Sequence, residues 1–88
     1  MKDTEFTITL GSDDHEILDD AVKRILVLDD GDKTSLNLTV LPVSKDGETG
    51  RRIQRRRIDI TSTDEKILAR AERIDFQKGV SVSAKSGK

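Results

Sequence analysis

The apolar residues of this 88-residue chain switch between two spacings, and the order of the switches limits the folds it can adopt. Alternating apolar and polar positions indicate strands over residues 5–10, 34–43, 50–61 and 80–84. Apolar residues spaced by three and four positions indicate helices over residues 13–28 and 63–74. The predicted order is therefore strand, helix, strand, strand, helix, strand.

This order predicts an α+β fold, a ferredoxin-like βαββαβ sandwich in which two helices cover one face of a four-stranded antiparallel sheet. The length and the lack of an internal repeat predict a single domain over residues 1–84, with a flexible C-terminal tail at 85–88. Asp13 or Asp14 is expected to cap the first helix. The second helix is expected to begin at Ser62 or Thr63, with Ser62 and Glu65 forming a capping box.

The two central strands form a hairpin in this scheme. Pro42 lacks an N–H donor, which favours an edge position for residues 34–43. Asp46-Gly47 is a strong hairpin-turn signal, but a two-residue turn would set Leu36 opposite Arg57 and bury a guanidinium group. Because a one-residue slip turns every side chain over, we expect an odd loop or a bulge that sets Leu36 opposite Ile58.

Several function classes find little support in the composition. The chain has no cysteine, which excludes disulfides and thiolate chemistry, and His15 is its only imidazole. We therefore expect no enzyme, no cofactor and no metal, since the acidic turn at residues 29–32 lacks the spacing of an EF-hand. No apolar run approaches a membrane span and the start is not a secretory signal, so a cytoplasmic protein is expected.

Charge is divided between the two halves of the chain. Residues 1–50 carry 12 acidic and 5 basic side chains, whereas residues 51–88 carry 5 acidic and 11 basic ones. Five arginines fall within residues 51–57, and on an extended strand they point alternately to both faces. The guanidinium groups of arginine bind phosphate through paired hydrogen bonds, which predicts phosphate contact. The other interpretation is a solvated strand whose arginines discourage pairing at the sheet edge. With no Tyr or Trp, base stacking is not expected.

The order of several short motifs resembles the small-subunit ribosomal protein S-ten family. The matching segments are Asp14-His15-Glu16-Ile17-Leu18-Asp19, Arg57-Ile58-Asp59-Ile60, Thr63-Asp64-Glu65-Lys66, Arg73-Ile74-Asp75 and Gly79-Val80-Ser81-Val82. The resemblance covers nearly the whole predicted body and implies the same fold. The long hairpin arm of the family is shortened here to about residues 44–50.

The resemblance implies a non-enzymatic module that binds structured RNA, including ribosomal RNA, beside neighbouring ribosomal proteins. The expected RNA-binding residues are Arg51, Arg52, Arg55, Arg56, Arg57, Lys45 and His15. By its position beside Asp14, His15 is most simply a surface or capping-region histidine at a helix start. The resemblance to the family adds a contact with RNA or a neighbouring protein as the other interpretation. The alternative is a protein-interaction adaptor, like the family's antitermination factor Nus E with its Nus-type partner, or a loop-shortened divergent or engineered form. An acylphosphatase-like enzyme is a distant third.

Overall fold

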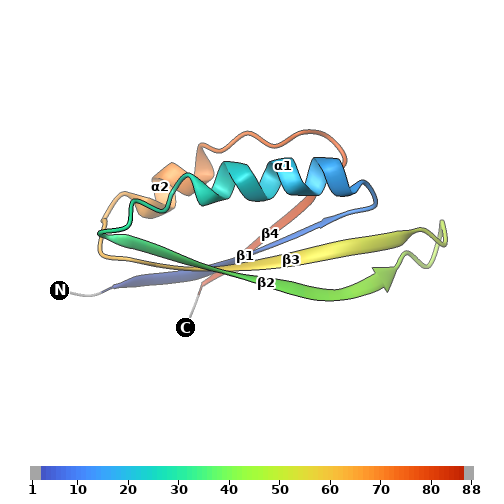
Figure 1. Cartoon of the computed structure of the whole chain (residues 1–88), viewed down its shortest axis with the longest axis horizontal. Helices are drawn as coiled ribbons and strands as arrows, with labels where there is room; N and C mark the ends of the chain where they lie inside the picture. The colour runs from blue at the N-terminus through green and yellow to red at the C-terminus, as the bar shows by residue number, and fades with distance from the viewer. Residues whose placement is uncertain (1–2, 87–88) are drawn as a thin grey trace.

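The computed structural model describes residues 3–86, which form an α+β fold with a four-stranded antiparallel sheet and two helices. Its elements are β1 (Thr4–Ser12), α1 (His15–Leu26), β2 (Thr34–Lys45), β3 (Arg52–Ser62), α2 (Ile67–Glu72) and β4 (Ser81–Ser86). The strands lie in the order β2-β3-β1-β4. Figure 1 shows both helices on the same side of the sheet, with the β2–β3 hairpin extending past the start of α1.

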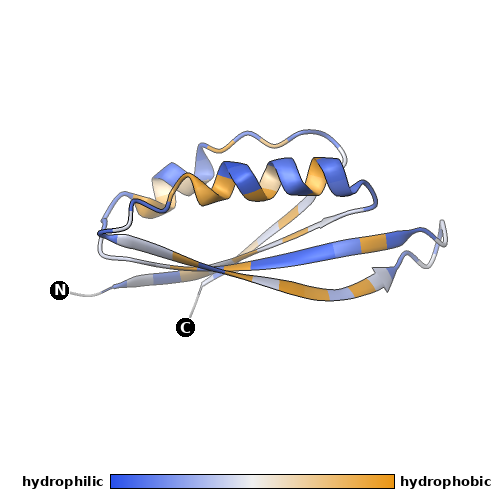
Figure 2. Ribbon diagram, viewed as in Figure 1, coloured by the Kyte–Doolittle hydropathy of each residue, from blue (hydrophilic) through white to orange (hydrophobic). Residues whose placement is uncertain are grey.

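The core lies between the sheet and the helices, on the face that the alternating apolar residues predict. Its buried side chains are Phe6, Ile8, Leu10, Leu18, Ala21, Val22, Ile25, Leu28, Ile58, Ile60 and Ile67. Only Ile67 comes from α2, so α1 supplies most of the helical contribution. Figure 2 shows that β3 becomes mostly hydrophilic beyond this core, toward the hairpin.

The predicted cap of α1 is confirmed. Asp14 is the N-cap residue, and its Oδ1 accepts hydrogen bonds from the backbone N–H groups of Glu16 and Ile17 at 2.9 and 3.4 Å. Just before it, the buried Ser12 hydroxyl donates to the carbonyl oxygen of Gly79 at 2.7 Å and accepts from the N–H of Asp14 at 3.1 Å. One serine thus ties the end of β1 to the connection that enters β4.

The predicted capping box of the second helix is wrong. α2 begins at Ile67 rather than near Thr63, and its N-cap residue, Lys66, makes no side-chain cap hydrogen bond. Ser62 is buried and its hydroxyl lies 2.7 Å from that of Thr34, while it also accepts from the N–H of Asp64 at 3.0 Å. Because Ser62 has a tertiary partner, it stabilises the end of β3 instead of starting a helix.

The expected bulge in the hairpin is confirmed, but the expected pairing of Leu36 with Ile58 is wrong by two residues. Leu36 lies opposite Ile60 and Leu38 lies opposite Ile58, so the predicted faces are right. The register shifts between Leu41 and Ser44, where β2 carries one extra residue beside Pro42. Residues 46–51 then connect the strands. As the proline indicates, β2 is an edge strand.

The C-terminal boundary also differs from the prediction. Lys85 and Ser86 belong to β4, where Lys85 lies opposite Thr7. They are therefore not part of a tail, and residues 87 and 88 lie outside the described part of the chain. Between residues 3 and 86, no helix is long and apolar enough to cross a membrane.

Candidate nucleic-acid interface

The arginine-rich part of the chain lies on an inner strand of the sheet. In β3, Arg57 lies between Thr9 of β1 and Thr39 of β2. Two residues earlier along the chain, Arg55 lies between Gly11 and Leu41. Since β1 runs beside β3 as far as Gln54, most of these arginines are fixed in a three-stranded region rather than on a free arm.

Strand alternation divides the four arginines of β3 between the two faces of the sheet, as predicted, whereas Arg51 lies in the connection just before the strand. Arg55 and Arg57 lie on the face opposite the helices, here called the open face, while Arg52 and Arg56 lie on the helix side. Arg56 lies opposite Leu10 and Val40 and is partly buried, and its Nη1 donates to the carbonyl oxygen of Arg55 at 2.9 Å. The two faces therefore do not offer equivalent guanidinium groups.

Two of the five arginines form ion pairs. Arg51 Nη1 lies 2.7 Å from Asp13 Oδ2, and Arg57 Nε lies 3.5 Å from Asp59 Oδ2. Both pairs are solvent-exposed, so each contributes little to stability. Within residues 3–86, the guanidinium groups of Arg52, Arg55 and Arg56 have no carboxylate within 4.0 Å.

Two cations face each other near the base of the hairpin. Lys45 lies directly opposite Arg52, both side chains are exposed, and neither has an acidic partner within 4.0 Å in the described chain. Like charges directly opposite each other on neighbouring strands are destabilising. A bound anion between them would relieve that repulsion.

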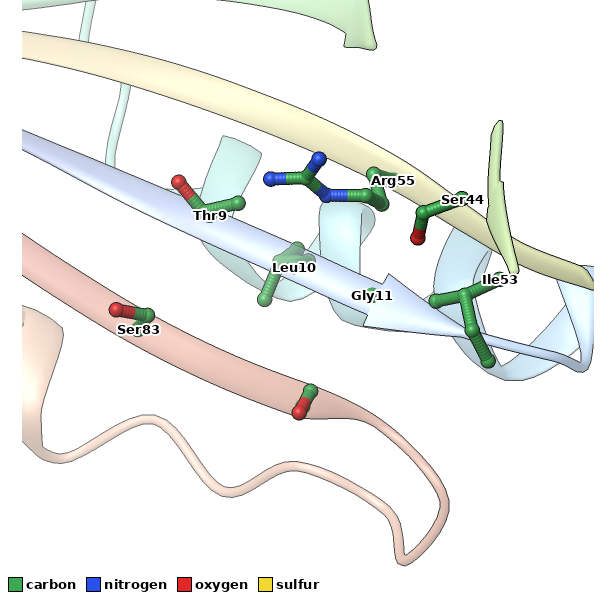
Figure 3. A pocket seen from close by; sticks show the side chains of 8 residues that line it. Thr9, Leu10, Gly11, Ser44, Ile53, Arg55 and Ser83 are labelled. Atoms are coloured by element: carbon green, nitrogen blue, oxygen red, sulfur yellow. The ribbon is translucent and has the colours of Figure 1, made fainter. Parts of the chain in front are cut away.

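The open face carries a shallow depression of about 230 Å³ around Arg55. It is lined by Thr9, Leu10, Gly11, Ser44, Ile53, Arg55, Ser81 and Ser83. Figure 3 shows the Arg55 side chain lying along the sheet toward Thr9, with Ser83 on the neighbouring strand. A guanidinium group surrounded by hydroxyl donors suits a phosphate group.

Gly11 shapes one wall of this depression. A Cβ atom at residue 11 would lie 3.3 Å from Cγ2 of Ile53 and 3.9 Å from Cγ of Arg55. The absence of a side chain therefore lets both residues approach the β1 backbone. Gly11 is buried, and its place beside Arg55 follows from the β1–β3 register.

His15 does not join the arginines in a contact. It is the exposed first residue of α1, and no hydrogen bond or ion pair of the described residues involves its ring. Asp13, Asp14 and Glu16 flank it in the sequence, which makes its surroundings anionic. Its predicted RNA contact stays a prediction.

The tip of the hairpin is acidic rather than basic. Asp46 Oδ1 accepts hydrogen bonds from the N–H groups of Glu48 and Thr49 at 2.8 and 3.3 Å. These bonds, that from Glu48 first, lower the pKa of the Asp46 carboxyl below its usual 3.8. Together with the Glu48 carboxylate, the tip keeps a negative charge that would repel phosphate. The cationic surface therefore ends at the base of the hairpin.

The hydroxyl groups beside Arg55 were not among the site residues predicted from the sequence. Thr9, Ser81 and Ser83 come from β1 and β4, which lie far from the arginines in the sequence. The alternation over residues 5–10 already placed Thr9 away from the core. It could not show which β3 residue lies beside it. Between residues 3 and 86, no three acidic or histidine side chains are grouped to hold a metal ion.

No protein-family model matches the chain, and no curated protein matches it.

Proposed function

We propose that this chain is a non-enzymatic, cytoplasmic module that binds structured RNA, including ribosomal RNA, through phosphate contacts of β3. The observation that carries the proposal is a group of cations in β3 and at the adjacent end of β2 that have no acidic partner within the described residues, namely Lys45, Arg52, Arg55 and Arg56. In a chain with formal net charge −1, such a concentration on one segment favours a polyanionic partner.

The open face is the better docking surface for the RNA backbone. No helix covers it (Figure 1), and Arg55 there has hydroxyl neighbours that add hydrogen-bond donors. Arg55 and Arg56 are both partly buried, but Arg56 already donates a hydrogen bond to a backbone carbonyl oxygen. The only two aromatic residues, Phe6 and Phe76, lie in or against the core, so recognition follows backbone shape rather than base stacking.

We also propose that the chain has a ferredoxin-like fold and is a member of the S-ten family. Taken from the other edge, the strand order is β4-β1-β3-β2, which supports the ferredoxin-like arrangement with its two βαβ crossovers. The five segments that resemble the S-ten family fall at the start of α1, along β3, before α2, directly after α2 and at the start of β4. The acidic hairpin tip suggests surface docking on RNA, without deep insertion.

A comparison of two single variants tests which face of the sheet binds the RNA. Arg55→Gln and Arg56→Gln remove the same charge from neighbouring residues of β3. We expect Arg55→Gln to weaken binding to a labelled RNA hairpin by about tenfold or more at low salt, because a charge-assisted bond is worth roughly 1.5 kcal/mol or more. Arg56→Gln should weaken it less than threefold. Equal losses would place the docking surface elsewhere, and no binding by the wild type would refute the RNA function.

A protein-interaction adaptor is the second candidate, and one observation favours it. An apolar groove of about 250 Å³ lies between β4 and the α2 region. Leu68 and Val82 line it and remain 48% and 45% exposed. A helical partner of the Nus type would bury both side chains. Capture of a partner from lysate before and after nuclease treatment separates the candidates, since only the adaptor predicts a nuclease-resistant complex that Leu68→Lys abolishes.

A further inference from the structure

The outer edge of β2 lacks the charges that usually protect an edge strand. Residues 34–44 contain no charged side chain, although 38% of the chain is charged. Edge strands present unsatisfied N–H and C=O groups and are commonly blocked by charged residues, bulges or proline. Here Pro42 and the bulge lie at one end only, which leaves residues 34–41 open to pairing.

Apolar side chains accompany this open edge. On the helix side of β2, Leu38 is 42% exposed and Val40 is 68% exposed, while Leu36 packs partly against the core. These three side chains form an apolar stripe along β2, and the helices leave Leu38 and Val40 of that stripe largely uncovered. β4, the other edge, is half as long and carries a charged residue, Lys85, next to its last position.

We propose that β2 pairs in antiparallel fashion with β2 of a second copy of this chain, so that two sheets form one continuous eight-stranded sheet. The stripe on β2 is self-complementary about Leu38. With Leu38 opposite the partner's Leu38, Leu36 meets the partner's Val40, and the reverse pair forms by symmetry. On the open face, Asn37 then meets the partner's Thr39, a polar pair that suits a solvated surface.

The charge distribution is compatible with this two-fold arrangement. Antiparallel pairing places the arginine-rich halves of the two β3 strands at opposite ends of the joined sheet. The segment that meets its own copy is the uncharged one, so no like charges are brought together at the contact. The proposal does not depend on RNA binding and is testable without it.

Sedimentation velocity of the whole chain tests the dimer. Because a strand-edge contact is small and binds weakly, the concentration should be varied from about 5 µM to about 500 µM. We expect the mass to rise from 9.8 kDa toward twice that value and then to stop, since a two-fold contact closes on itself. A wild type that stays monomeric throughout, or that grows beyond two copies, would overturn the proposal.

Val40→Lys and Val82→Lys form a matched pair of variants. Both replace an exposed valine of an edge strand, on β2 and on β4 respectively. Val40→Lys should raise the dimer dissociation constant by at least about tenfold, because a two-fold contact contains the lysine twice. Val82→Lys should leave it unchanged. Equal effects of the two variants would contradict pairing through β2.

Hydrogen exchange gives a second readout that does not depend on a variant. Backbone amides of residues 36–40 should exchange more slowly at about 500 µM than at about 5 µM, because the paired edge gains hydrogen bonds. The amides of β4 serve as the internal reference. Protection that does not change with concentration in β2, or that changes in β4 instead, would refute the proposed contact.

Discussion

Asp13 holds Arg51 through a contact of 2.7 Å between Oδ2 and Nη1, which joins the start of α1 to the end of the hairpin connection. The arginine side chain is 69% exposed and the carboxylate side chain 34%. An exposed pair of this kind adds little to stability, but it occupies one of the five guanidinium groups. Asp13 is therefore placed to compete with phosphate for Arg51.

Replacing Asp13 with Asn should strengthen RNA binding. Loss of the carboxylate frees Arg51, so we expect the dissociation constant for a labelled RNA hairpin to fall about two- to fourfold at low salt. The free energy of unfolding should change by less than about 1 kcal/mol. Fluorescence anisotropy and urea denaturation measure the two quantities. Asp32→Asn, an exposed residue of the α1–β2 connection, is the control of equal charge. An equal gain in that control would show only a net-charge effect.

The buried hydroxyl pair of Thr34 and Ser62 should couple the two strands that carry it. Their oxygen atoms lie 2.7 Å apart, and both residues are at most 2% exposed. Ser62→Ala leaves the Thr34 hydroxyl and the Asp64 N–H without this partner, which should cost about 1–3 kcal/mol in urea denaturation. The double variant Thr34→Val/Ser62→Ala should cost less than the sum of the two single changes. Ser35→Ala, which removes the hydroxyl of an exposed β2 residue, is the control. Additive effects would show that the two hydroxyls do not interact.

Asp30 should make stability sensitive to acid. Its Oδ1 accepts hydrogen bonds from the N–H groups of Asp32, Lys33 and Thr34 at 2.9, 2.8 and 3.0 Å, and these, the bond from Asp32 first, lower the pKa of Asp30 below 3.8. Because the folded pKa is the lower one, the stabilisation is present above pH 3.8 and is lost as the pH falls toward the folded value.

The thermal unfolding midpoint between about pH 6 and pH 2 measures this dependence. Asp30→Asn should lower the midpoint at pH 6 and make the curve flatter below pH 4. Some slope should remain, since hydrogen bonds also lower the pKa values of Asp20, Asp46 and Asp64. Asp19→Asn, on the exposed face of α1, should reproduce the wild-type curve. An Asp30→Asn curve parallel to the wild type would contradict the assignment.

Much of the fold could be predicted because the apolar pattern is local. Phe6, Ile8 and Leu10 alternate and lie buried on one face of β1, as expected. The Asp14 cap could also be predicted, since its partners lie two and three residues away. The capping box could not, because the partner of Ser62 is Thr34, 28 residues earlier.

For the hairpin, the sequence predicted which side of the sheet each residue faces, but not which residues pair across the two strands. The dipeptide Asp46-Gly47 indicated the turn, but Gly50, with φ of +70°, takes the left-handed position. The extra residue of β2 near Pro42 then shifts which β2 residue pairs with each β3 residue. The arginines of the candidate site were visible because they are contiguous in the sequence. Their hydroxyl neighbours and the ion pair between Arg51 and Asp13 depend on the sheet order, which no local pattern shows.

The salt dependence of RNA binding tests most directly whether the β3 arginines that have no acidic partner among the described residues contact phosphate. The triple variant Arg52→Gln/Arg55→Gln/Arg56→Gln removes the three β3 arginines that have no acidic partner among the described residues. Of these, Arg55 on the open face and Arg52 beside Lys45 are the expected phosphate contacts. The matched control, Lys23→Gln/Lys66→Gln/Arg73→Gln, removes three exposed cations from α1 and from either end of α2. Both variants change the net charge equally.

The measurement is the slope of log K against log salt concentration for a labelled RNA hairpin. Each phosphate contact contributes roughly 0.7–0.9 to that slope, so the β3 triple variant should reduce it by about two, while the control should keep the wild-type slope. Equal slopes in the two variants, or a wild-type affinity that does not fall with salt, would contradict the account.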